Sequence, residues 1–317
     1  MMSTTQSIQL GSIERRESIS HEEWVTQFLI PRIPVIFTKA LDSWPARQKW
    51  TPEFFKERYG SMPLTVEGQN HTLGGFLPTR KDGGSLTMGE FIDQVLTSSD
   101  QNPSPYLRNV WLEKFLPELD ADLQPAPPYF SPNWLEGPFT QPLYPRLHAG
   151  HPELYIGGRG GKFPVLHFDS WHIYVFLCQL YGSKEYTVFA PDQTPFLYPQ
   201  DYHVSSISVD EIEDVDLKRY PLFAKATPIR FQLNPGEMLF VPPGWWHMAK
   251  ILSPSISISV TRVNSSNWSQ FAAELRQCSP FYLKPFVWSY LTAFRAFRAM
   301  YGSDNFVNRP GQTSKAA

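Results

Sequence analysis

The chain has 317 residues, of which 42% are hydrophobic and 15% aromatic, so it can bury the core of one large domain. Its 28 basic and 30 acidic residues give a formal net charge of −2, which offers no basic surface for nucleic acid or an anionic membrane. We therefore expect no nucleic-acid partner and no membrane partner. The start has no signal-peptide pattern, and no apolar run reaches the roughly 20 residues of a membrane span, which predicts a cytoplasmic protein.

The N-terminal third mixes short helices with strands. Residues 1–20 are polar, and we expect a flexible N-terminus there. Ile33–Thr38 is rich in β-branched residues and predicts a short strand. Thr51, followed by proline, predicts a helix start with a hydroxyl cap. Thr87 and Glu90 form the pattern of a capping box, which predicts a second helix directly after them.

The rest of the chain changes pattern three times. Proline is dense in residues 125–145, which favours an ordered loop. Residues 153–262 carry short β-branched and aromatic runs separated by Gly, Pro and Asp, typical of a sandwich or barrel. Residues 266–302 predict C-terminal helices, whose aromatic face either packs on the parent domain or forms a homodimer. Residues 303–317 are predicted to be a disordered tail.

Several other patterns carry little chemistry. Cys178 and Cys278 lie far apart, which predicts two reduced thiols rather than a disulfide or a metal motif. The glycine-rich run Gly157–Lys162 lacks the spacing of a phosphate loop, so we interpret it as a tight turn. His148 and His151 are expected at the surface.

The triplet His167-Phe168-Asp169 is the first candidate for a site. Alternate side chains of a strand point to the same face, so the His and the Asp would project together. One imidazole and one carboxylate supply two ligands for a metal such as iron(II). Taken alone, this triplet is a weak signal.

A second segment can complete the ligand set. The run from Leu239 to Trp246 predicts a strand that enters a Pro-Gly turn, and His247 follows. Two His and one carboxylate on one side of a metal leave three positions open, the arrangement of non-haem iron(II) oxygenases. Lys184 begins a third apolar strand after a Gly-Ser turn. If it points into the barrel it needs an anion, which the carboxylate of a cosubstrate would supply.

These segments together resemble the JmjC-type hydroxylases, iron(II)/2-oxoglutarate oxygenases of the cupin class related to the HIF asparaginyl hydroxylase. The chain carries H-x-D, G-x-K, P-x-x-x-x-x-L-Y-P and P-G-E-x-L-F-V-P-x-x-W-W-H in this order, which is similar to the pattern of that family. The matching segments are His167 to Asp169, Gly182 to Lys184, Pro191 to Pro199, and Pro235 to His247. With weaker matches upstream, the resemblance covers roughly residues 30 to 265.

The resemblance implies roles position by position. The implied iron(II) ligands are His167, Asp169 and His247. Lys184 and Tyr106 would bind the far carboxylate of 2-oxoglutarate, and Ser259 and Thr261 would line the same pocket.

The chain also departs from the usual pattern of the family. Pro164 stands where the family often has a hydroxyl residue that contacts 2-oxoglutarate. The stretch between Asp169 and Lys184 is slightly longer than in many relatives and lacks an asparagine, for which His172, Tyr174 and Gln179 are the candidate substitutes. Arg108 and Trp171 are expected near the mouth of the site.

The resemblance implies a mainly β fold, a double-stranded β-helix with N-terminal α/β decoration and C-terminal helices. Residues 21–265 would form the catalytic domain. The implied activity is hydroxylation of an amino-acid residue of a protein or peptide, with Fe(II), 2-oxoglutarate and O2. Hydroxylation of an N-methyl group would make the same chemistry a demethylation. A small-molecule hydroxylase is an alternative, and a non-catalytic metal-binding cupin is an alternative of another class.

Overall fold

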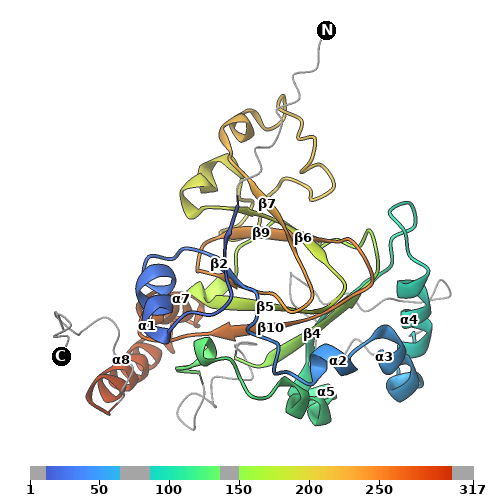
Figure 1. The fold of residues 1–317 in the computed structure, drawn as a ribbon. Helices are drawn as coiled ribbons and strands as arrows, with labels where there is room; N and C mark the ends of the chain where they lie inside the picture. The colour runs from blue at the N-terminus through green and yellow to red at the C-terminus, as the bar shows by residue number, and fades with distance from the viewer. Residues whose placement is uncertain (1–11, 65–85, 136–149, 302–317) are drawn as a thin grey trace, which may run out of the picture.

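Short strands separated by turns pair into two sheets that enclose the centre of the molecule (Figure 1). The computed structural model describes residues 12–64, 86–135 and 150–301. In order across the larger sheet, the strands are β1 (Glu14–Arg16), β2 (Val35–Phe37), β8 (Met238–Val241), β5 (Tyr174–Tyr181), β10 (Ser255–Arg262), β4 (Pro152–Gly157) and β3 (Tyr106–Trp111). The smaller sheet has the order β7 (Ile229–Leu233), β6 (Lys184–Phe189) and β9 (Trp246–Ile251).

Strand β10 shows how the sequence separates the two faces of the larger sheet. Its alternation of serine and apolar residues sends Ile256, Ile258 and Val260 into the large outer core. The intervening Ser257 and Ser259 point to the opposite, inner face. Every residue of the strand is buried. The hydroxyl face of β10 therefore lines the inside of the barrel.

The predicted metal-binding strand extends the smaller sheet without forming a regular strand. Lys162 and His167 make isolated bridges to β9, at Lys250 and His247 respectively. Between the two bridges lies Pro164, which has no N–H for the ladder. The predicted continuous strand is therefore reduced to two points of pairing, the second at the candidate ligand.

The N-terminal helices pack on the outer face of the larger sheet, with which they share one apolar core. Those before residue 116 are α1 (His21–Trp24), continued by a π-helical turn (Val25–Leu29), α2 (Ala46–Lys49), α3 (Pro52–Tyr59), α4 (Met88–Leu96) and α5 (Leu112–Phe115). Thr51 caps α3 by accepting from the N–H of Phe54, and Thr87 and Glu90 form the predicted capping box of α4. Short 3-10 turns follow at Pro117–Leu123, Pro128–Phe130, Ser170–His172, Pro191–Phe196 and Pro221–Lys225.

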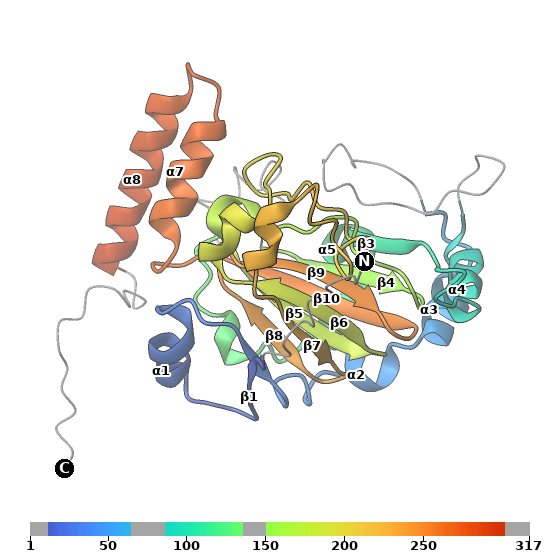
Figure 2. The same ribbon diagram turned by 90° about the horizontal axis from the view of Figure 1, so that it is seen from above.

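Two C-terminal helices form a hairpin, α7 (Trp268–Cys278) and α8 (Lys284–Tyr301), as the sequence predicted. Figure 2 shows the hairpin standing out from one end of the barrel, opposite α3 and α4. Leu291 of α8 and Trp268 and Phe271 of α7 are buried in a separate apolar cluster that joins the hairpin to the barrel. The predicted packing onto the parent domain thus accounts for one face of the hairpin.

The fold class is a cupin-like β barrel with added helices, as predicted. The predicted flexible N-terminus differs at Glu14–Arg16, which pairs in parallel with β2; its charged side chains gave no strand signal. Residues 1–11 and the predicted tail at 303–317 lie outside the described residues, as does the second part, residues 136–145, of the loop predicted at 125–145. Cys178 is buried, Cys278 is exposed, and both are free thiols as predicted. In the described part of the chain, no helix is long and apolar enough to cross a membrane.

Candidate metal centre

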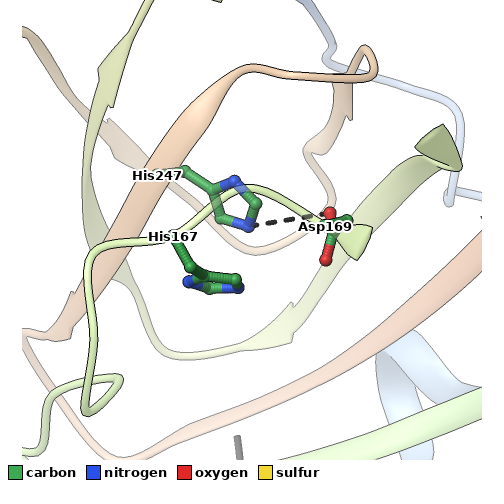
Figure 3. A group of neighbouring side chains, drawn as sticks. All are labelled: His167, Asp169 and His247. Atoms are coloured by element: carbon green, nitrogen blue, oxygen red, sulfur yellow. Dashed lines mark ion pairs between the residues drawn. The ribbon is translucent and has the colours of Figure 1, made fainter. Parts of the chain in front are cut away.

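His167 and His247 lie opposite each other at the edge of the smaller sheet. The N–H of His247 donates to the carbonyl of His167 at 2.6 Å, and the reverse bond is 3.2 Å long. The ring centroids are 4.5 Å apart. Oδ2 of Asp169 lies 3.8 Å from Nε2 of His247. Figure 3 shows the three side chains gathered around one point, and a ligand atom from each lies within 4.8 Å of the others.

The backbone orients both imidazole rings. Nδ1 of His167 lies 3.2 Å from the carbonyl oxygen of Val165, and Nδ1 of His247 lies 3.0 Å from that of Trp245. A carbonyl only accepts, so each Nδ1 carries the proton and each Nε2 presents its lone pair. Second-sphere bonds of this kind hold metal-binding histidines in many proteins.

The electrostatics of the cluster suit a divalent cation. Burial, together with the neighbouring His247, lowers the pKa of His167 well below its usual value, so the ring is neutral and can ligate. Burial also raises the pKa of Asp169, because few charges compensate it. A divalent cation would compensate the carboxylate directly. Two imidazoles and one carboxylate on one side of such an ion match the iron(II) ligand set of oxygenases.

An aromatic side chain forms one wall of the site. The ring of Phe163 stacks on His167, with centroids 4.4 Å apart and planes 17° from parallel. The guanidinium of Arg108 lies 4.8 Å from the centroid of Phe163. Arg108 was expected near the mouth but is only 2% exposed. Arg108 therefore contacts the metal cluster only indirectly, because its guanidinium packs on Phe163 and Phe163 stacks on His167.

The ammonium of Lys184 is buried on the inner face of β6. Nζ donates to the hydroxyl of Tyr106 at 2.7 Å and to Oγ of Ser257 at 2.5 Å. The ring centroid of Tyr155 lies 5.7 Å from Nζ. Burial lowers the pKa of Lys184 from 10.5 to about 7. Both hydrogen-bond partners are neutral hydroxyls, and no described carboxylate lies within ion-pair distance, so the pocket is suited to an anionic ligand.

A family model described as a cupin-like domain matches residues 20–263. The chain belongs to the cupin-like family. The predicted membership of JmjC-type iron(II)/2-oxoglutarate oxygenases is confirmed, because the chain matches this cupin-like model and its relatives bear names of JmjC proteins and demethylases.

Three relatives illustrate the similarity. Lysine-specific demethylase JMJ21 of Arabidopsis thaliana is 29% identical over 272 residues, which cover 81% of this chain and 26% of that protein. Lysine-specific demethylase 8 of Xenopus tropicalis is 29% identical over 246 residues, or 76% of this chain and 50% of that protein. Arginine-specific demethylase JMJ20 of Arabidopsis thaliana is 26% identical over 281 residues, or 82% and 59%. The chain thus spans less than two thirds of each relative.

Lys184 contacts Ser257, which is neither of the two residues that the family resemblance implied for this pocket. Ser259 and Thr261 lie on the same inner face of β10 as Ser257, but farther along the strand. Oγ1 of Thr261 accepts from the N–H of Gly150 at 2.7 Å, and among the described residues Ser257, not Ser259, is the serine that accepts from Lys184. The alternating sequence identified the hydroxyl face but not which hydroxyl lies beside the lysine.

The departures from the family pattern lie mostly away from the metal. Pro164 is exposed, and the neighbouring Phe163 contacts His167 instead. His172 pairs with Glu274, with Nδ1 and Oε2 2.8 Å apart. The Tyr174 hydroxyl accepts from Asn264. Gln179 lies on the inner face of β5. Its Nε2 donates to the carbonyls of Tyr181 and Gly182 and to Oγ of Ser255, at the ends of strands β5 and β10.

Two further predictions concern the mouth and the loop histidines. Trp171 is half-buried and packs on the C-terminal cluster near Phe271, with ring centroids 6.4 Å apart. His151 was predicted to lie at the surface. It is partly buried, pairs with Glu113 and stacks on Trp111, so its side chain is held by both neighbours. His148 lies outside the described residues.

The sequence did not reveal a buried acid on β4. Oε2 of Glu153 accepts from Nδ2 of Asn109 at 2.9 Å and from the hydroxyl of Tyr155 at 3.1 Å. Burial raises the pKa of Glu153 to about 7, and the nearby Asp169 adds to this effect. Glu153 therefore belongs to the polar interior around the metal cluster, although nothing in its strand motif distinguished it from a surface glutamate.

Proposed function

We propose that this chain is an iron(II)- and 2-oxoglutarate-dependent oxygenase acting on an amino-acid side chain of a protein or peptide. The observation that carries the proposal is a cluster of two His and one Asp in the same barrel as a buried lysine that has no anion partner among the described residues. On β6, Val188 pairs with His247, and Lys184 begins the same strand. Roughly 13 Å of strand separates these two positions. The lysine side chain and a five-carbon dicarboxylate together can span that distance.

The bound iron(II) supplies the redox chemistry, in which R–H, 2-oxoglutarate and O2 give R–OH, succinate and CO2. The residues of the chain do the rest. His167, Asp169 and His247 hold the metal on one side. Lys184 and Tyr106 bind the far carboxylate and so orient 2-oxoglutarate.

The inner faces of the sheets keep water away from the cosubstrate. Tyr186 and Val188 of β6 and Val175 of β5 are buried in an apolar cluster between the sheets. A carboxylate bound at Lys184 would lie between this cluster and the hydroxyls of Ser257 and Tyr106. In such a low-dielectric pocket the ion pair is stronger than in water, which favours tight binding of the dianion.

Removal of an N-methyl group from a lysine or arginine residue is the reaction that we favour, because relatives bear the names of lysine-specific and arginine-specific demethylases. Hydroxylation of an unmethylated side chain is the same reaction on a different C–H bond. Peptides carrying methylated and unmethylated Lys and Arg should be incubated with the iron-loaded protein and 2-oxoglutarate. Formaldehyde release with loss of a methyl group supports demethylation, whereas gain of one oxygen atom supports hydroxylation. Turnover of 2-oxoglutarate without any peptide product would favour a small-molecule substrate.

We further propose a homodimer formed through the C-terminal hairpin. Phe286 and Met300 of α8 are both 70% exposed, and Phe281 in the preceding turn is 83% exposed. Apolar side chains this exposed are common at protein–protein interfaces. A second copy of the chain would cover them. The cytoplasmic location stays a prediction.

A further inference from the structure

The turn after the metal ligand Asp169 has an unusual backbone. Trp171 and the next residue, His172, have φ angles of 66° and 49°. Both lie in the left-handed region, which bulky L-residues rarely adopt because Cβ meets the following carbonyl. Two such residues in succession persist only where neighbouring groups hold them. The position of Asp169 therefore depends on whatever holds this turn.

The carboxylate of Glu274, on α7, holds the turn from outside the barrel. Oε1 accepts from the backbone N–H of Trp171 at 2.7 Å, and Oε2 lies 2.8 Å from Nδ1 of His172. The hydroxyl of Tyr202 donates to Oε1 as well. One carboxylate thus joins α7, the turn after Asp169 and the loop that contains Tyr202.

A second residue of α7 supports the same turn. Nδ2 of Asn267, at the start of the helix, donates to the carbonyl of His172 at 2.9 Å. Glu274 is only 9% exposed. Burial alone would raise its pKa, but hydrogen bonds from His172, Tyr202 and Trp171 together lower it, so the group is ionised.

We propose that Glu274 is a positioning residue for the metal centre, which makes α7 part of the catalytic machinery. By accepting from the Trp171 N–H it keeps the left-handed turn closed and the Asp169 carboxylate facing His167 and His247. The inference rests on the proposed metal site. The side chain at position 274 must be long enough to accept from the Trp171 N–H, so its length matters more than its charge.

Three variants distinguish the effect of side-chain length from the effect of side-chain charge. Glu274→Asp keeps the charge but is one methylene too short to reach the Trp171 N–H. Glu274→Gln keeps the length, and its amide oxygen can still accept from Trp171 and Tyr202. Gln277→Ala, at an exposed position of the same helix, is the matched control. Mn(II) binding is titrated by electron paramagnetic resonance, and urea unfolding is measured on the same samples.

We expect Glu274→Asp to raise the Kd for Mn(II) about tenfold, as for other second-sphere losses. Glu274→Gln should stay within about threefold of wild type, and Gln277→Ala should not change. An Asp variant within about twofold of wild type, or a Gln variant weaker than the Asp variant, overturns the inference. If the Asp variant does not fold, the Gln variant decides alone, and a tenfold loss overturns the inference. Absence of Mn(II) binding by the wild type would instead overturn the proposed metal site, and this inference with it.

Discussion

Nζ of Lys184 lies 2.7 Å from the phenolic oxygen of Tyr106, although the two residues come from opposite sheets. The pair joins the two sheets through a buried cation whose hydrogen-bond partners are neutral hydroxyls. Burial raises the pKa of Tyr106 above its usual value, so this hydroxyl keeps its proton and can donate to a carboxylate. The pair is therefore prepared for an anion before one binds.

Removal of the Lys184 ammonium should weaken the binding of 2-oxoglutarate without affecting the binding of the metal. Lys184→Met has a similar length and no charge, and we expect its KM for 2-oxoglutarate to rise at least about tenfold, the loss of one charge-assisted hydrogen bond. Mn(II) affinity should be unchanged. Succinate formation across a 2-oxoglutarate series measures the effect, with the exposed Lys225→Met as control. An unchanged KM would remove Lys184 from the proposed clamp.

Affinity for 2-oxoglutarate should fall as the pH rises above neutrality. The pKa of Lys184 in the ligand-free protein is about 7, and a bound dianion stabilises the charged form. Binding therefore takes up a proton above that pKa, and the affinity decreases by up to about tenfold per pH unit. Calorimetry on the Mn(II)-loaded protein between about pH 7 and pH 9 measures this slope. Lys184→Met should bind weakly with a much flatter pH dependence, and equal slopes in the two proteins would contradict the assignment.

The structure and the family resemblance favour different serines in the cosubstrate pocket. Ser257→Ala removes a hydrogen bond to Lys184 and should raise the KM for 2-oxoglutarate about fivefold, equivalent to about 1 kcal/mol. Ser259→Ala, two residues along the same face, is the matched comparison and should change the KM less than about twofold. The reverse order of effects would support the family-based prediction instead.

The glycine of the Gly-Ser-Lys turn should be needed for folding. Gly182 has a φ of 61°, and a Cβ at this position would lie 1.8 Å from the carbonyl oxygen of Pro254. Gly182→Ala is expected to lower the free energy of unfolding by about 2–3 kcal/mol. Ser183→Ala should stay within about 0.5 kcal/mol of wild type. Urea unfolding compares them, and equal midpoints would show that the turn relaxes without cost.

The proposed dimer can be tested by its mass in solution. Phe286→Glu combined with Met300→Glu places two charges on the exposed face of α8, and we expect it to convert a dimer into monomers. Thr292→Glu is a control on an exposed part of the same helix away from that face. Light scattering measures the mass, and a monomeric wild type would contradict the proposal.

Local signals of the sequence predicted local structure well. The caps at Thr51 and Thr87 depend on residues within one helical turn, so their pattern alone indicates both helix starts. The metal and lysine motifs were found because linked patterns occur in order along the chain. The fold class followed from those motifs and from the spacing of the strand-like runs.

Contacts between distant segments could not be read in this way. The choice of Ser257 over Ser259 depends on where Lys184 of β6 lies against β10, which alternation does not specify. Glu274 resembles any other helical glutamate until α7 packs against the turn at Trp171. The pairing of β1 with β2 likewise depends on backbone bonds that the charged side chains of β1 do not indicate.

Iron-dependent release of succinate tests the central claim most directly. The protein is incubated with iron(II), ascorbate, 2-oxoglutarate and the methylated and unmethylated peptides, beside an Asp169→Ala variant checked for folding. We predict that wild type forms succinate only when iron(II) is present, and that Asp169→Ala forms none because a ligand is lost. Full activity in the Asp169→Ala variant, or no succinate from the wild type under any of these conditions, would contradict the assignment of this chain as an iron(II)/2-oxoglutarate oxygenase.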